Sequence, residues 1–120
     1  MNPILRTAAV ATAALALSGS AAADTTPIGK LPPGPVQVVT TERGQLVAAS
    51  LPKLRNLDWR VARRVNSRVV RQVTEGEVGG TIVVVFRAVG KGKATIPFAA
   101  TRGDSGSEAF RSVTYRVTVR

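Results

Sequence analysis

The chain has 120 residues, with no histidine and no cysteine, and 17 Lys and Arg against 7 Asp and Glu give a formal net charge of +10. The missing residue types exclude metal sites built from histidine or cysteine, and they exclude nucleophiles that depend on a histidine base, so the protein is not expected to be an enzyme. The excess of positive charge favours acidic surfaces as partners.

The first 23 residues have the layout of a secretory signal peptide. Arg6 precedes an uncharged apolar stretch over residues 7–17, and the alanines at 21–23 fit a cleavage site before Asp24. The stretch is shorter than the ~20 residues that span a bilayer. A retained anchor or a disordered tail is the alternative. Cleavage predicts a secreted or periplasmic protein with no membrane attachment, in which residues 24–35 form an extended, Pro/Gly-rich lead-in and residues 36–120 form one domain.

Seven short strands are predicted after the lead-in, at a spacing typical of an all-β, immunoglobulin-like antiparallel sandwich. In the last strand the apolar residues alternate with polar ones, which places Val113, Tyr115, Val117 and Val119 on one face. Trp59 is expected to fill the core, although a ligand-stacking role is the alternative. The predicted strands cover residues 36–41, 45–50, 59–63, 68–73, 81–89, 94–99 and 112–120.

The connections between these strands predict where a binding surface lies. Residues 42–44, 64–67 and 90–92 read as short turns, whereas 51–58, 74–80 and 102–108 read as longer loops. Pro52 is expected to prevent regular pairing at the start of the first long loop. Alternate connections emerge at opposite ends of a sandwich, so the three long loops are expected to share one end. Loops longer than closure requires often carry binding residues.

The acidic residues are too sparse to predict catalysis or a metal site. Glu75 with Glu77, and Asp104 with Glu108, leave a weak calcium site as an alternative, but a tight site requires about six to eight oxygen ligands. Residues 103–107 resemble the nucleophile segment of chymotrypsin-like proteases, yet no histidine is present to act as base. The tripeptide 102–104 matches an integrin-binding motif at a length expected by chance. No cofactor and no metal are predicted.

The densest group of basic residues is expected to form a solvated outer sheet face. This basic group consists of Arg60, Arg63, Arg64, Arg68 and Arg71.

Nucleic acid is not an expected partner, because the chain has an export signal and few aromatic residues for stacking on bases.

The order and spacing of several features make residues 36–119 resemble the chagasin family of cysteine-protease inhibitors. These features are a glycine in the first turn, Leu-Pro ahead of a loop that ends in tryptophan, a Gly-Gly pair before a strand with phenylalanine, and the run at 90–98. An arginine after the sixth strand and a final Val-x-Val run complete the set. In this sequence they are Gly44, Leu51, Pro52, Trp59, Gly79, Gly80, Phe86, residues 90–98, Arg102 and residues 117–119.

The resemblance implies that three loops form a wedge that enters the cleft of a papain-like protease. The family's loop motifs are only partly present. Asn-Pro-Thr-Thr-Gly is missing from residues 51–58, only Gly79 and Gly80 of Gly-x-Gly-Gly remain, and Gly103-Asp104 replaces Pro-Trp after Arg102. By position, the implied protease-binding residues are Leu54, Arg55, Asn56, Val78, Gly79, Arg102 and Asp104.

Two functions follow from the sequence. The first is a secreted or periplasmic inhibitor, expected to be a monomer, that reversibly occludes the active-site cleft of a papain-like cysteine protease. The alternative is a non-inhibitory envelope binding or adaptor module that recognises an acidic protein or polymer. Salt distinguishes the two, because charge-driven binding weakens more steeply as ionic strength rises.

Overall fold

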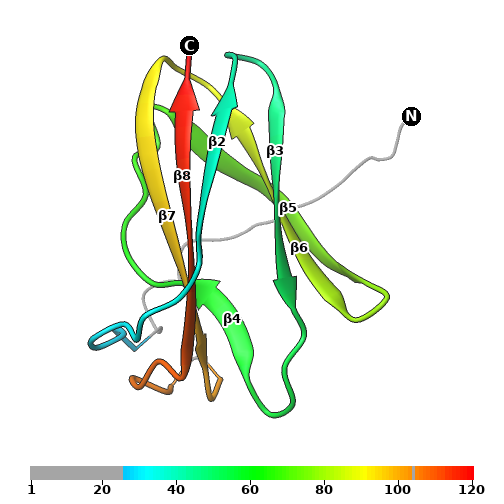
Figure 1. Ribbon diagram of the computed structural model, residues 1–120, viewed down its shortest axis with the longest axis vertical. Helices are drawn as coiled ribbons and strands as arrows, with labels where there is room; N and C mark the ends of the chain where they lie inside the picture. Colours follow the sequence, from blue (N-terminus) through cyan, green and yellow to red (C-terminus); the bar gives the residue numbers. More distant parts are fainter. Residues whose placement is uncertain (1–25, 104) are drawn as a thin grey trace.

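The computed structural model describes residues 26–103 and 105–120, which form two facing β-sheets (Figure 1). The predicted signal peptide and Asp104 lie outside this part of the chain. The strands are β2 (Val36–Thr41), β3 (Leu46–Pro52), β4 (Asp58–Val61), β5 (Val70–Val78), β6 (Thr81–Ala88), β7 (Gly92–Thr101) and β8 (Arg111–Val119). Among the described residues there is no helix long and apolar enough to cross a membrane.

The sheet order confirms the immunoglobulin-like β-sandwich predicted from the sequence. One sheet has the order β2-β8-β7-β4 and the other the order β3-β6-β5. Every pairing is antiparallel except that of β2 with β8, which is parallel. β4 ends at Val61 opposite Phe98, and the next residue of β7, Pro97, has no N–H to donate to a longer β4.

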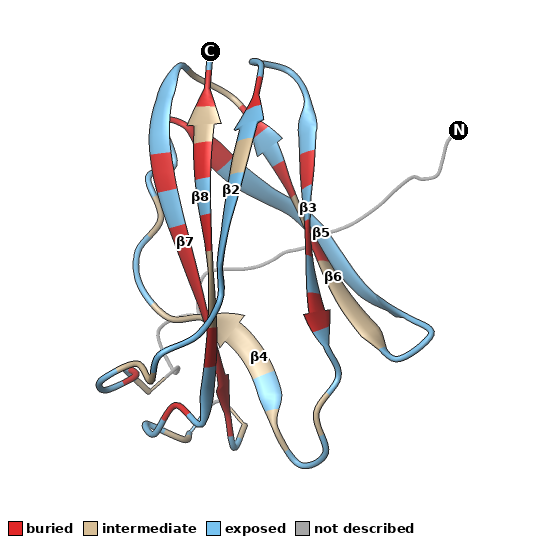
Figure 2. Ribbon diagram, in the orientation of Figure 1, coloured by how far each residue is buried: buried red, intermediate tan, exposed pale blue. Residues whose placement is uncertain are grey.

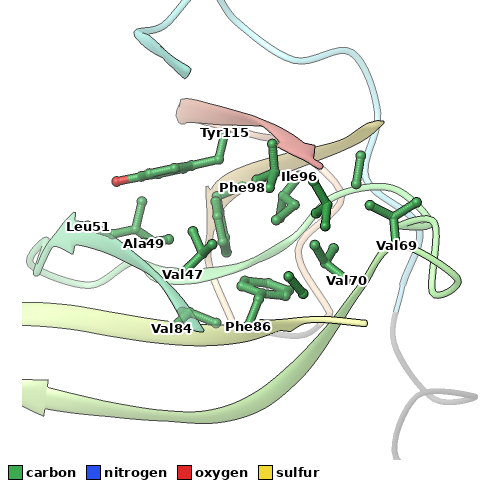
Figure 3. Packing of buried hydrophobic residues seen from close by; sticks show 14 residues of the cluster. Val47, Ala49, Leu51, Val69, Val70, Val84, Phe86, Ile96, Phe98 and Tyr115 are labelled. Atoms are coloured by element: carbon green, nitrogen blue, oxygen red, sulfur yellow. The ribbon is translucent and has the colours of Figure 1, made fainter. Parts of the chain in front are cut away.

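The core lies between the sheets and follows the period-two pattern of the strands. β3 alternates exposed and buried residues along its whole length, with Val47, Ala49 and Leu51 inward. Phe98 on β7 lies between Phe86 of the facing sheet and Tyr115 on β8, in edge-to-face contacts with ring centroids 6.3 and 6.0 Å apart (Figure 3). Such contacts add to the stability that area burial alone supplies.

Two of the predicted connections are wrong. Residues 74–80 were expected to be a loop, but β5 continues to Val78, and only Gly79 and Gly80 form the turn to β6. The predicted short turn at 64–67 is instead an eight-residue crossover, residues 62–69, which carries the chain from one sheet to the other (Figure 1). The polar residues of β5 lack a strand-like pattern because almost the whole strand is exposed (Figure 2).

The prediction that Pro52 would prevent pairing is also wrong, because Pro52 ends β3 opposite Thr81. The next residue, Lys53, donates its backbone N–H to the carbonyl of Gly80 at 3.0 Å. Successive backbone nitrogens point to opposite sides of a strand, so the nitrogen of Pro52 faces the free side of the edge strand β3. A proline is tolerated there because no partner strand requires its N–H.

The lead-in packs against the outer face of the four-stranded sheet. Ile28 and Leu31 pack with Ala99 and Ala109 in a second, smaller cluster, and Ser112 donates its hydroxyl to the carbonyl of Pro32 at 2.6 Å. β7 is therefore buried on both faces over its second half (Figure 2).

Part of the predicted arginine face is exposed and also has a structural role. Arg63 donates to the carbonyls of Ile28 and Gly29 at 3.0 and 2.8 Å and so holds the lead-in, while Arg71 donates to the carbonyl of Ser67 at 3.1 Å.

Candidate functional site

Three connections meet at one end of the sandwich: the β3–β4 loop (residues 53–57), the β5–β6 turn (79–80) and the β7–β8 loop (102–110) (Figure 1). The hydrogen bond from Lys53 to Gly80 joins the first two. The pairing of Asp58 with Thr101 places the end of the β3–β4 loop beside the start of the β7–β8 loop. The shared end expected from strand order is therefore present, although the β5–β6 connection is a tight turn and not a long loop.

The β3–β4 loop is fixed at its base and turns sharply at its tip. Trp59 donates its indole Nε1–H to the carbonyl of Pro52 at 2.6 Å, which closes the loop. Asn56 has a φ of 61°, a left-handed conformation that asparagine tolerates better than most other residues. Leu54 and Leu57 are half-buried, whereas Arg55 and Asn56 are exposed.

The β5–β6 turn has φ values of 54° at Gly79 and 82° at Gly80. Positive φ at both central residues defines a type I′ hairpin turn, whose twist matches that of the flanking strands. Val78, the last residue of β5, is 69% exposed. The turn therefore presents one apolar side chain and a compact backbone at the shared end.

The β7–β8 loop is organised by hydrogen bonds to Arg60 and Thr101. Arg60 donates to the carbonyl of Gly106 at 2.6 Å and to the hydroxyl of Thr101 at 3.3 Å. The Thr101 hydroxyl in turn donates to the carbonyl of Gly103 at 2.8 Å. These bonds hold the nine-residue polar loop against β4 and against β7, the strand that precedes it.

Phe110 is the residue of this loop that sequence reasoning missed. Its side chain is 39% exposed, and the guanidinium carbon of Arg102 lies 5.1 Å from the centroid of its ring. The two residues line a shallow hollow of about 340 Å³ with Gly106, Ser107 and Glu108. The available signal was an aromatic residue at the end of a polar loop, next to a predicted strand.

A second depression, the inter-sheet groove, lies between the β3–β4 loop and the β5–β6 hairpin and has a volume of about 370 Å³. Its apolar lining is Leu54, Leu57, Trp59 and Ile82, and its charged lining is Lys53, Asp58, Glu75 and Glu77. Trp59 packs partly on the core and partly lines this groove, so the predicted core role accounts for only one side of the indole.

The residues predicted for the site divide into three places. Leu54 lines the inter-sheet groove, and Arg55 and Asn56 stand at the tip of the same loop. Val78 and Gly79 form the hairpin end, and Arg102 lies over Phe110. Asp104 lies outside the described residues. Among the residues that the structure does describe, no group of three or more His, Cys, Asp or Glu is arranged to hold a metal ion.

Comparison with known proteins gives a likeness of fold. A scan against protein-family models finds no match, and a search of curated proteins finds no similar sequence. The structure is similar to the crystal structure of the cysteine protease inhibitor EhICP2 from Entamoeba histolytica, with a TM-score of 0.55 and 17% sequence identity over 74% of this chain and 99% of that one. At this identity the likeness shows the fold alone, and it supports the chagasin resemblance at that level.

Proposed function

We propose that this protein inhibits papain-like cysteine proteases by placing the three connections at its shared end into the active-site cleft. The observation that carries the proposal is the agreement of two facts. The whole sandwich matches the fold of a cysteine protease inhibitor, and the three connections implied by the chagasin resemblance lie at the same end of it. Secretion or export to the periplasm, where such proteases would be met, belongs to the same proposal.

The shared end has properties that suit reversible occlusion. Its loops are held by the bonds of Trp59 to Pro52 and of Arg60 to Gly106, so little conformational entropy is lost when they bind. Val78 and Phe110 are exposed apolar groups at this end. Binding energy at protein interfaces is concentrated in a few residues, often aromatic ones. Phe110 thus supplies an aromatic anchor in a loop that lacks the Pro-Trp pair of the family.

Inhibition of papain by the purified protein, with and without the Phe110→Ala substitution, tests this function. We expect a measurable inhibition constant for the unmodified chain and an increase of about tenfold or more for the variant, the effect of losing an interface anchor. The matched control is Leu46→Ala, because Leu46 is an exposed apolar residue at the start of β3, away from the shared end. Absence of inhibition at high micromolar concentration across several papain-like enzymes would refute the proposal.

The second candidate function, binding to an acidic protein or polymer, is favoured by one observation. Arg71 and Arg87 are directly opposite each other on β5 and β6, and both are exposed. Like charges at opposite positions of a sheet repel, and an anionic partner would relieve this repulsion. Binding of this kind should weaken steeply between low and physiological salt and should be reduced by Arg87→Gln, whereas papain inhibition should be unaffected by that variant.

A further inference from the structure

The inter-sheet groove is acidic in a protein that is otherwise strongly basic. Asp58, Glu75 and Glu77 line it, and they are three of the seven acidic residues in a chain with 17 Lys and Arg. A single basic residue, Lys53, is present among the lining residues. The local charge of the groove therefore has the opposite sign to that of the whole molecule.

The strand register explains how these carboxylates come to face the groove. Glu75 is opposite Val84 and Glu77 is opposite Ile82 across the β5–β6 ladder, and directly opposite residues share a face of the sheet. Val84 is buried in the core and Ile82 packs against it. Glu75 and Glu77 thus occupy core-facing positions. In Figure 1 the β5–β6 hairpin leads away from β4 as it approaches its turn. The groove lies between this part of the hairpin and the start of β4.

One of these carboxylates already binds a cation of the protein itself. The ammonium of Lys53 lies 3.0 and 3.2 Å from the two carboxylate oxygens of Glu77. The two side chains are 56% and 45% exposed, and exposed pairs of this kind contribute little to stability. An incoming cation can therefore replace Lys53 at little cost. Glu75 is held in place by a hydrogen bond of 3.1 Å from the amide of Gln72.

We propose that the inter-sheet groove receives an arginine or lysine side chain from the surface of the bound protein. The apolar lining of Leu57, Trp59 and Ile82 matches the aliphatic stem of such a side chain, and the carboxylates match its charged end. The indole of Trp59 adds a surface on which a cation is favourable. That the bound protein is a protease rests on the proposed function, but the preference of the groove for a basic side chain does not.

The composition of the chain provides a direct probe, because Trp59 is its single tryptophan. Fluorescence of the full chain, excited selectively at tryptophan, therefore reports on Trp59 and the groove that it lines. We expect a saturable change on titration with N-acetyl-arginine amide, and at least about fivefold weaker responses to the citrulline and norleucine amides, which lack the charge. Equal responses to the three amides, or no saturable response to the arginine compound, would overturn the proposal.

Charge-neutralising variants test the assignment to particular residues. Glu75→Gln with Glu77→Gln should abolish the arginine response, whereas the matched control, Glu42→Gln with Glu108→Gln, should retain it because those two acids do not line the groove. Lys53→Gln, which removes the competing ammonium, should tighten binding about two- to fivefold. Unchanged binding in both the Glu75/Glu77 variant and the Lys53 variant would count against the groove. These substitutions are at exposed positions, and thermal unfolding of each variant verifies that it folds.

The two proposals fail in different ways. Arginine binding without papain inhibition would refute the protease partner and leave the groove intact. Papain inhibition that is unchanged by Glu75→Gln with Glu77→Gln, together with no fluorescence response to the arginine amide, would refute the groove and leave the inhibitor function intact.

Discussion

Tyr115 links the two sheets through a polar group placed among apolar side chains. Its hydroxyl accepts the backbone N–H of Ser50 at 3.0 Å and lies 3.3 Å from the carbonyl of the same residue. Ser50 is on the edge strand β3, so a side chain from β8 takes the place that a neighbouring strand would otherwise fill. The ring also packs edge-to-face on Phe98. One residue thereby contributes to the core and closes part of a sheet edge.

Tyr115→Phe should lower the free energy of unfolding by about 1–2 kcal/mol. The ring and its contact with Phe98 would be kept, but the N–H of Ser50 would lose its partner in a partly buried place, which costs about this much. Urea unfolding of the variant beside the unmodified protein measures the difference, and the denaturant dependence should stay the same. A loss below about 0.3 kcal/mol would show that water replaces the hydroxyl at this edge.

At the scale of the element, the β5–β6 hairpin is determined by backbone conformation. A Cβ atom built on Gly79 or Gly80 would have no atom within 4 Å, so space does not require glycine at either position. Glycine is favoured there because both residues have a positive φ. The hairpin therefore depends on two local conformations, and through Lys53 and Glu77 it fixes one wall of the inter-sheet groove.

Gly80→Val should destabilise the protein by about 1–2 kcal/mol, the cost of a left-handed conformation for an ordinary residue. Gly79→Asn should leave stability within about 0.5 kcal/mol of the original, because Asn-Gly is the preferred pair in a type I′ turn. Chemical denaturation of the two variants makes the comparison. Equal stabilities would show that the turn has a different conformation in solution.

The elements with a clear periodic pattern could be predicted, and those without one could not. β2 has the bounds expected from its run of valines, and β8 shows the predicted alternation from Tyr115 onward. Before Tyr115, Val113 and Thr114 are both half-buried, and Ser112 is buried because the lead-in covers it. The second half of β5 was missed since acids and a glycine in an exposed edge strand resemble a loop. The eight-residue crossover and the parallel pairing of β2 depend on contacts between distant segments, which no local pattern encodes.

For the candidate site, strand order was enough to predict that three connections share an end, but the chemistry of that end was not predictable. The groove requires the register of β5 against β6, including a shift between Gln72 and Thr74, and the divergence of the hairpin from β4. Phe110 acquires its place through Arg102, eight residues earlier in the chain. Both features arise from contacts in the folded protein, and the identity of each residue alone does not predict these contacts.

At the scale of the whole molecule, positive charge is poorly compensated. The formal net charge is +10, and Lys53 with Glu77 is the one ion pair found among the described residues. Like charges held close together in a compact state repel, and this repulsion lowers stability. Dissolved salt screens interactions between exposed charges over about 8–10 Å at physiological strength. The stability of the fold should therefore depend on ionic strength.

Raising sodium chloride from about 20 to 200 mM should increase the midpoint of thermal unfolding by about 4 °C, which corresponds to about 1 kcal/mol for a domain of this size. A variant carrying Arg87→Gln and Arg116→Gln, both exposed positions, should show a smaller increase. Calorimetry at the two salt concentrations measures both. A midpoint that falls with added salt would mean that attractive surface pairs outweigh the repulsion.

The internal position of β8 has a consequence for synthesis. This strand lies between β2 and β7, yet it follows both of them in the chain, and β2 has no other partner in its sheet. While a ribosome is still making residues 111–119, β2 has no strand to pair with, and β7 lacks the neighbour on its side away from β4. The four-stranded sheet therefore cannot assemble in stages from the amino terminus, and it stays incomplete until β8 has been made.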